Sequence, residues 1–345
     1  MTSTVTGSGV YRSAGTSVLT VAAVDAPRVV TSAEIDERLA ATYRRTGLRP
    51  GLLERLVGIR ERRWWADGVT YADGAAMAGA KALAEAGIDA ADVGVLINTS
   101  VSRAHLEPST AVSVHDALGL PAQCQNFDLA NACLGFVNAM QIAGGMIESG
   151  QIDYALVVNG EDARPVQENT LARLEGPNAT AAQVWDEFAT LTLGSGAAAM
   201  VLGRGEHHPE GHRIVGGVNR ASTQHHQLCV GDIQMMRTDS KGLLEAGLQL
   251  TADVWVDAAD AGFDWSAMDR YVIHQISQVH TDALCRRVGI NQDRVPRTFP
   301  TRGNIGPASV PYTLAAEAQE LQPGDRVLLM GIGSGLNASL TEIHW

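Results

Sequence analysis

The sequence is poor in lysine, in aromatic residues and in charge of positive sign. Only Lys81 and Lys241 are lysines among 26 basic residues, aromatic residues make up 5% of the chain, and the net charge is −12. A nucleic-acid-binding protein needs a basic face to neutralise phosphates. The acidic balance therefore excludes a nucleic-acid partner, although an anionic ligand could still bind where a few arginines gather.

Cysteines are few, and they lack the spacing of a metal site or a disulfide framework. The four cysteines stand at positions 124, 133, 229 and 285. Metal ligands and disulfide frameworks of small secreted proteins recur at short, regular spacings. The histidine pairs 207–208 and 225–226 have no suitably spaced acidic or thiol partner, so we expect no metal. Free thiols in this pattern favour a reducing compartment, and we expect a cytoplasmic protein.

Long apolar runs are also missing. No stretch approaches the roughly 20 apolar residues that a membrane-spanning helix requires. The segment Ser17–Val24 faintly resembles the apolar part of a signal peptide, but it is rich in β-branched residues and follows only one basic residue, Arg12. We predict that this segment is the first core strand and that the chain has no membrane span.

What the sequence does contain is an alternation of strand-like and helix-like segments. Hydrophobic residues make up 45% of the 345 residues, and there are 36 glycines. Continuous apolar runs at 93–98 and 154–158 are typical of strands covered on both faces. Helical spacing follows Ser32, the predicted N-cap, and an Ala-rich helix is expected over 69–87, ending at Gly87. The pattern predicts an α/β fold.

The second part of the chain repeats the order of the first. Residues 268–273 parallel 91–96, residues 297–304 parallel the approach to Cys133, and residues 324–330 parallel 152–158. Matched segments in the same order indicate a duplicated strand–helix unit. We predict halves at 1–205 and 206–345, the first with an entrance insertion over 161–190. Two mixed sheets with helices between and outside them should result.

Cys133 is the first candidate for chemistry. It stands in Asn-Ala-Cys-Leu-Gly-Phe, where a strand is expected to lead into a helix that runs to Gly150. A thiol at a helix N-terminus lies in the positive end of the backbone dipole, which lowers its pKa. The alternative is a packed core cysteine, since free cysteine is often buried.

His274 and Asn304 are candidates for the groups that act with this thiol. His274 follows the strand-like Tyr-Val-Ile, at a carboxyl end where α/β folds gather ligands. It can activate a thiol or donate to a thioester oxygen. Asn304 lies between Gly303 and Gly306, and its amide can stabilise an enolate oxygen. The alternatives are a structural histidine and a turn asparagine.

A glycine-rich segment near the C-terminus, Gly-Ile-Gly-Ser-Gly over 331–335, is the fourth element. Glycines allow a backbone to approach a ligand closely, so the Ser334 N–H could join the Cys133 N–H in an oxyanion hole. Strand-like sequence follows this segment. A nucleotide-binding fingerprint requires a helix there, so that reading is excluded.

These motifs together resemble the thiolase superfamily, on the ketoacyl-ACP synthase III branch, over nearly the whole chain. The resemblance rests on the Cys133 motif, His274-Gln, Gly-Asn-Ile-Gly-Pro-Ala-Ser, the terminal Gly-Ile-Gly-Ser-Gly and the early Gly58-Ile-Arg-Glu-Arg-Arg63. It implies a five-layered αβαβα thiolase fold built from two duplicated halves and a homodimer. It also implies Cys133, His274 and Asn304 as the acyl-transfer triad, with no cofactor beyond coenzyme A thioesters as substrates.

Glu107, in Leu-Glu-Pro-Ser-Thr, determines the subgroup. Ketoacyl-ACP synthase III enzymes usually have an apolar residue here, whereas the olefin-biosynthesis thiolases of the OleA type have a glutamate that enters the neighbouring active site. A decarboxylating synthase needs no base, but a condensation of two unactivated thioesters must remove an α-proton, which a carboxylate can accept. The alternative role for Glu107 is to stabilise the start of a helix at about Ser109.

The family's coenzyme A contacts carry over only in part. The stretch Leu52–Val57 supplies no tryptophan, and Gln278 and Val279 stand where an arginine often follows the histidine. Arg60, Arg62 and Arg63 are candidates by charge alone. They could equally be partners in structural ion pairs. Trp64 and Trp65 are interpreted as packing residues.

The resemblance therefore implies head-to-head condensation of two fatty acyl-CoA molecules to a 2-alkyl-3-ketoacyl product, on a route to a long-chain olefin or a β-lactone. One alternative is a decarboxylative 3-oxoacyl-ACP synthase III that primes fatty acid or polyketide synthesis. Another is a non-catalytic subunit that pairs with a paralogue or works with a downstream enzyme.

Overall fold

Residues 9–345 are described by the computed structural model, so residues 1–8 of the predicted first half lie outside the described part. A ten-stranded mixed sheet organises the molecule, with the order β12-β13-β14-β9-β2-β8-β7-β5-β6 and β1 paired with β9. The chain passes between the two ends of this sheet after β8 (Gly196–Arg204), which is followed by β9 (His212–Ala221).

One end of the sheet is built by the first part of the chain. Its other strands are β2 (Thr16–Asp25), β5 (Val93–Asn98), β6 (Gln125–Asp128) and β7 (Tyr154–Glu161). The strands predicted at 17–24, 93–98 and 154–158 are confirmed. Because β5 pairs in parallel with both β6 and β7, the carboxyl ends of these strands lie at one edge.

The other end of the sheet contains β1 (Val10–Arg12), β12 (Arg270–Ile273), β13 (Arg326–Gly333) and β14 (Asn337–His344) together with β9. β12 and β13 are parallel, and β14 runs antiparallel to both β13 and β9. Only two residue pairs, Ser17↔Arg213 and Val18↔His212, join β2 to β9. The two sheets predicted from the sequence are thus one continuous sheet with a narrow junction.

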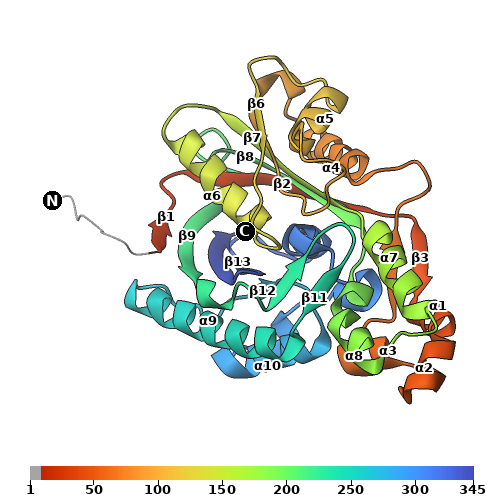
Figure 1. Ribbon diagram of the computed structural model, residues 1–345. Coiled ribbons are helices and arrows are strands. Elements are labelled where there is room, and N and C mark those ends of the chain that lie inside the picture. The colour runs from red at the N-terminus through yellow and green to blue at the C-terminus, as the bar shows by residue number, and fades with distance from the viewer. Residues whose placement is uncertain (1–8) are drawn as a thin grey trace.

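Helices occupy three layers around these strands (Figure 1). Two helices, α6 (Gly135–Glu148) and α12 (Ser309–Glu317), contact strands of both ends of the sheet. The helices α4 (Tyr71–Ala86) and α5 (Thr110–Ala117) cover the outer face of the first end. The helices α9 (Ser240–Asp260) and α10 (Gln278–Val288) lie outside the second end. The order is helix, sheet, helix, sheet, helix.

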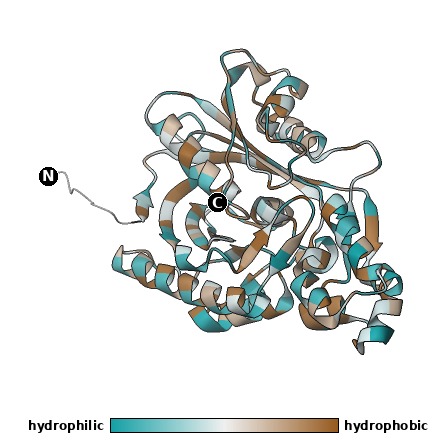
Figure 2. Ribbon diagram, viewed as in Figure 1, coloured by the Kyte–Doolittle hydropathy of each residue, from teal (hydrophilic) through white to brown (hydrophobic). Residues whose placement is uncertain are grey.

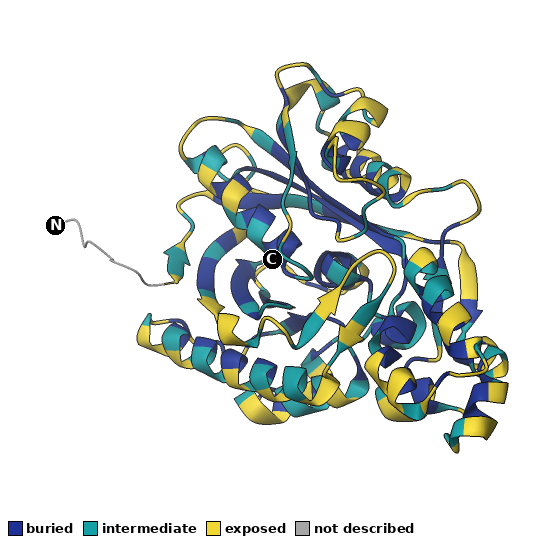
Figure 3. Ribbon diagram, in the orientation of Figure 1, coloured by how far each residue is buried: buried dark blue, intermediate teal, exposed yellow. Residues whose placement is uncertain are grey.

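The central helix α6 explains why the two ends pack together. Its side chains Phe136, Met140 and Ile147 are buried in the largest apolar cluster, with residues of β2, β5, β7 and β13. Burying each such side chain stabilises the fold by about 1.5–3 kcal/mol. The central strands are hydrophobic and buried, and exposed residues gather on the outer helices (Figures 2 and 3).

A helical lobe flanks one side of the sheet. It contains α1 (Ser32–Arg38), α2 (Ala40–Thr46), α3 (Leu52–Val57), α7 (Arg164–Glu175) and α8 (Ala181–Asp186), so the helical character predicted for 161–190 is confirmed. Short strands β3 (Arg28–Thr31) and β4 (Glu61–Trp64) pair beneath it, and β10 (Cys229–Gly231) pairs with β11 (Met236–Thr238) nearby.

Two of three local predictions differ from the structure. The N-cap of α1 is Thr31, whose hydroxyl accepts from Glu34 N–H, and not Ser32 as predicted. Gly87 ends α4 with φ 66°, as predicted. Residues 297–304 were expected to match the strand before Cys133, but they form the short helix α11 (Phe299–Arg302), so the duplication is incomplete there.

None of the helices within residues 9–345 has the length and apolar character that crossing a membrane requires.

Candidate functional site

Cys133 lies in a tight loop between β6 and α6. The loop is strained, because Ala132 has φ 44°, a left-handed conformation that few non-glycine residues adopt. The helix begins at Gly135 with Leu134 as its N-cap, so the thiol precedes the helix and does not start it. The expected helix from Cys133 to Gly150 is two residues shorter at each end, Gly135–Glu148.

The surroundings of Cys133 raise its pKa to about 12, mainly because burial disfavours the thiolate and further because of the nearby carboxylate of Glu161 and the thiol of Cys229. The prediction of a lowered pKa is therefore wrong for the resting protein. A thiol with this pKa is protonated at neutral pH. Its proton must pass to another group when the sulfur attacks a thioester.

His274 directly follows β12, as predicted, and its backbone N–H donates to the carbonyl of Met330 on β13 at 2.9 Å. Burial lowers the pKa of His274 to about 3, because the imidazolium loses hydration, with a further effect of His280. Its Nδ1 is buried and has no hydrogen-bond partner among the described residues. A neutral imidazole with a free nitrogen can exchange a proton with a ligand that enters.

This burial gives a pH dependence. The folded protein keeps His274 neutral down to about pH 3, whereas the unfolded chain protonates it below its ordinary pKa of 6.5, so the unfolded state gains protons as the pH falls. We expect His274→Asn to be the less pH-sensitive protein. The free energy of unfolding of wild type minus that of the variant should fall by up to about 1.4 kcal/mol for each pH unit below 6.5.

Urea unfolding of both proteins at pH 7 and pH 5 measures this difference. Comparing wild type with the variant cancels other titrating groups, including Glu161, whose raised pKa acts in the opposite direction. An unchanged difference between the two pH values would contradict a buried neutral His274.

Asn304 sits in a turn that is fixed on both sides. Its backbone N–H donates to Thr192 carbonyl, and its own carbonyl accepts from Gly194 N–H, both at 2.9 Å. Its side-chain oxygen accepts from Gly306 N–H at 3.0 Å. This bond orients the amide so that its NH2 group is the part left to donate to a ligand oxygen.

Ser334 lies in the turn between β13 and β14, beside the Cys133 loop. A Cβ placed at Gly333 would lie 2.8 Å from the carbonyl oxygen of Asn131, and Asn337 donates to the Asn131 side chain at 3.1 Å. Only glycine allows this approach. The residue before Ser334 therefore lies against the loop that contains Cys133.

A chain of contacts brings the three candidates to one region. The carboxyl ends of β12 and β13 lie side by side, and a Cβ at Gly331 would meet Leu134, the residue after Cys133, at 2.6 Å. Glu161, at the end of β7, acts on the Cys133 thiol and packs against Gly306 of the Asn304 turn. The topology thus gathers strand ends from both halves around the thiol.

Glu107 is not part of this cluster within its own chain. It lies in the exposed loop 101–109, where the neighbouring Leu106 is 94% exposed. The first amides of α5, Thr110 N–H and Ala111 N–H, donate to Asp128. Asp128 therefore fills the helix-start role that was the alternative for Glu107.

The three arginines differ in their surroundings. Arg62 is fully buried, and its guanidinium donates to the carbonyls of Val30 and Leu191 and to the Ser32 hydroxyl. A guanidinium enclosed in this way has no surface for a phosphate, so the expectation for Arg62 is corrected to a structural role. Arg60 is exposed, and Arg63 is half-buried beside Glu61.

Glu161 and Asp128 were not singled out from the sequence. Each is an acid that ends a β-strand at the carboxyl edge, and this placement is the signal that could have identified them. Trp64 and Trp65 are both buried, as predicted, and Trp65 donates to the Glu161 carbonyl at 2.9 Å.

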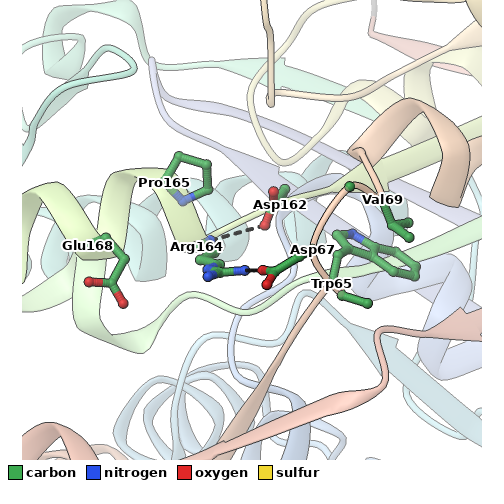
Figure 4. A pocket seen from close by; sticks show the side chains of 9 residues that line it. Trp65, Asp67, Val69, Asp162, Arg164, Pro165 and Glu168 are labelled. Carbon is green, nitrogen blue, oxygen red and sulfur yellow. Dashed lines mark hydrogen bonds and ion pairs between the residues drawn. The ribbon is translucent and has the colours of Figure 1, made fainter.

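A separate pocket of about 330 Å³ opens beside the start of α7 (Figure 4). Its walls include Trp65, Val69 and Pro165, and Arg164 points to Asp67 across it. None of the residues predicted to take part in chemistry lines this pocket. Asp162, the residue after β7, is one of its lining residues, and the pocket does not form part of the cluster around the thiol.

The chain is similar in sequence to known proteins over most of its length. Residues 127–220 match the family of 3-oxoacyl-[acyl-carrier-protein (ACP)] synthase III, and residues 258–345 match the C-terminal family of the same enzymes. The acyl-CoA:acyl-CoA alkyltransferase of Xanthomonas campestris is 47% identical over 95% of this chain and 98% of its own. The acyl-CoA:acyl-CoA alkyltransferase of Shewanella oneidensis is 35% identical over 93% of this chain and 96% of its own.

Solved structures agree with these sequences. Xanthomonas campestris OleA with bound lauric acid and lauroyl-CoA has a TM-score of 0.94 and 46% identity, covering 96% of this chain and 99% of that one. A cerulenin-bound form of the same protein has a TM-score of 0.95 and 45% identity, and the match covers 98% of this chain and 99% of that one. The beta-ketoacyl-ACP synthase III of Laribacter hongkongensis is 32% identical over 84% of this chain and 88% of its own.

Proposed function

Because this chain belongs to the ketoacyl-ACP synthase III-like branch of the thiolase superfamily, with the acyl-CoA:acyl-CoA alkyltransferases, we propose that it condenses two fatty acyl-CoA molecules head to head. The observation that carries this proposal is the 47% identity with an alkyltransferase over almost the entire length of both chains. Identity with a ketoacyl-ACP synthase III is lower, at 32%, and extends over a smaller share of this chain, 84%. Its thiolase-like αβαβα fold is shared with the OleA structures.

Cys133 takes the first acyl group. Its sulfur attacks the thioester carbonyl of acyl-CoA, its proton passes to His274, and coenzyme A leaves as a thiol after receiving that proton. Thiol and imidazole are both neutral at rest, and the thiolate–imidazolium pair formed during attack is stabilised by mutual attraction. The N–H groups of Cys133 and Ser334 receive the developing oxyanion.

Glu107 of the neighbouring subunit then removes an α-proton from the second acyl-CoA. His274 and the Asn304 amide stabilise the enolate oxygen, and the enolate carbon attacks the Cys133 thioester. The carbon–carbon bond forms as the carbon–sulfur bond to Cys133 breaks. The products are a 2-alkyl-3-ketoacyl-CoA and the Cys133 thiolate, which becomes a thiol again with the proton that Glu107 had taken from the substrate.

The related OleA structures support this assignment of residues. Variants of the Xanthomonas campestris protein carry substitutions of one glutamate, one cysteine and one histidine. That glutamate and cysteine are separated by the same number of positions as Glu107 and Cys133, and the spacing from cysteine to histidine differs by one position from that between Cys133 and His274.

A homodimer in the cytoplasm completes the proposal. The loop 101–109 leaves Leu106 and Glu107 exposed on a single chain, as a segment that enters a second copy requires. Arg60 and Arg63 remain the candidates for coenzyme A phosphates, because each keeps solvent access near the helical lobe.

The test of this function is turnover with saturated acyl-CoA as the sole substrate. We expect release of one coenzyme A molecule for each 2-alkyl-3-ketoacyl-CoA formed, detected by thiol titration together with mass spectrometry of the product or its ketone. The physical reason is that a base at position 107 removes the need for decarboxylation. A requirement for a malonyl donor would contradict head-to-head condensation and favour a decarboxylative synthase.

A further inference from the structure

Glu161 is a buried carboxylate with an unusual set of partners. It ends β7 and is 6% exposed. One oxygen accepts from Val101 N–H at 2.7 Å. The other accepts from Ser102 N–H at 3.0 Å and from the Ser102 hydroxyl at 2.7 Å. These two residues begin the loop that carries Glu107.

The same side chain also touches the other side of the candidate site. A Cβ placed at Gly306 would lie 3.4 Å from the Glu161 side chain, and Gly306 N–H is the donor that fixes the Asn304 amide. The Asn159 amide donates to Glu161 at 3.3 Å. Charge on Glu161 also reaches Cys133, where it disfavours the thiolate.

Burial of a carboxylate is costly unless donors compensate it. Here burial raises the pKa of Glu161 to about 7, against the effect of the hydrogen bonds from residues 101, 102 and 159. A leucine or methionine would fill this space at a lower electrostatic cost. What the carboxylate provides, and an apolar side chain cannot, is fixed acceptors for the start of the loop.

We propose that Glu161 is a positioning residue for the condensation, holding the start of loop 101–109 against the Asn304 turn and so setting where Glu107 reaches in the neighbouring active site. This inference rests on the proposed function. Glu161 touches no substrate; it acts through residues 101–102 on the loop. Glu161 thereby affects condensation at the Cys133 of the other chain.

The first test is Glu161→Gln. Glutamine keeps the volume but offers one acceptor oxygen and a donor NH2, so it cannot accept from Val101 N–H and both Ser102 donors. We expect acyl loading of Cys133, followed by intact-protein mass, not to fall, because the variant removes the charge that disfavours the Cys133 thiolate. Condensation should fall about 10–100-fold, because misplacement by about 1 Å has that cost. Glu161→Asp should restore part of the loss.

Glu148→Gln is the matched control. Glu148 also accepts from two backbone N–H groups, Ala14 and Gly15, and from the hydroxyls of Ser13 and Thr16, but it anchors a segment remote from the site. Its substitution should lower the melting temperature and leave the ratio of condensation to loading unchanged. An equal fall of that ratio in both variants would overturn the proposal, since it would indicate general destabilisation.

The decisive test uses mixed dimers purified with two affinity tags. In one dimer, a chain with both Cys133→Ala and Glu161→Gln pairs with a wild-type chain. The only Cys133 thiol is then in the wild-type chain, and the loop that enters its site comes from the chain with Glu161→Gln. In the other, a Cys133→Ala chain pairs with a Glu161→Gln chain, so the working thiol receives an unaltered loop. We expect condensation to fall about 10–100-fold in the first dimer and to match that of a Cys133→Ala/wild-type dimer in the second.

Equal activity of the two mixed dimers would overturn the positioning role. The same pairs made with Glu107→Ala separate this outcome from failure of the proposed function. If Glu107→Ala acts across the dimer and Glu161→Gln does not, the function stands and the positioning role falls. If wild type makes no β-keto product from acyl-CoA alone, the function itself is overturned, and the inference falls with it.

Discussion

Cys133→Ala is expected to abolish the acyl-enzyme and to lower condensation by at least about 10⁴-fold. The sulfur forms the bond to the first acyl group, and loss of a covalent nucleophile removes the route itself, with only binding and oxyanion contacts left. Incubation with a long-chain acyl-CoA followed by intact-protein mass spectrometry measures the adduct. The coenzyme A released in the first turnover provides a second readout.

Cys229→Ala is the control for this experiment. Cys229 is half-buried near the same region, and its sulfur lies 3.4 Å from the Thr238 hydroxyl oxygen. It influences the Cys133 thiol but follows no strand end at the cluster. We expect the acyl adduct to persist in this variant. An adduct of wild-type yield on Cys133→Ala would show that another residue is the nucleophile.

Glu107→Gln is expected to separate the two half-reactions. Loading of Cys133 should remain near the wild-type rate, because the glutamate takes no part in the first acyl transfer. Condensation should fall about 10²–10⁴-fold, the usual contribution of a positioned general base. Single-turnover measurement of acyl-enzyme mass, then of β-keto product after a second acyl-CoA is added, reports each step.

His105→Gln provides the comparison within the same loop. His105 and Glu107 are both exposed in the single chain, so a change at either leaves the core untouched. Only the glutamate substitution should reduce condensation. If Glu107→Gln condenses acyl-CoA at the wild-type rate, Glu107 is not the base, and a decarboxylative reaction becomes the better description.

Local sequence was sufficient wherever short-range patterns decide the structure. The continuous apolar run in Val93–Asn98 predicted a strand with both faces covered, and it forms a buried strand between β6 and β7. Gly87 ends α4 because its φ of 66° is unfavourable for other residues. His274 and Asn304 could be singled out as candidates because the motifs place them at a strand end and in a glycine-rich turn.

Electrostatic environment was not predictable in this way. A thiol beside a helix start was expected to have a lowered pKa, but burial and the Glu161 carboxylate act in the opposite direction. Arg62 was considered for coenzyme A by charge alone, whereas strand β4 turns it into the core, onto the carbonyls of Val30 and Leu191. Both outcomes depend on residues distant in sequence.

The sequence by itself determined which segments are strands and helices and which residue types stand at their ends, because periodicity, caps and motifs act over a few neighbouring positions. Only the tertiary structure decided that both ends belong to one sheet, with two residue pairs between β2 and β9 at the junction, and that Glu161 connects the loop of Glu107 with the turn of Asn304. Such contacts join residues separated by 60 or more positions in the chain. Burial and charge at these contacts arise from the packing of all layers together.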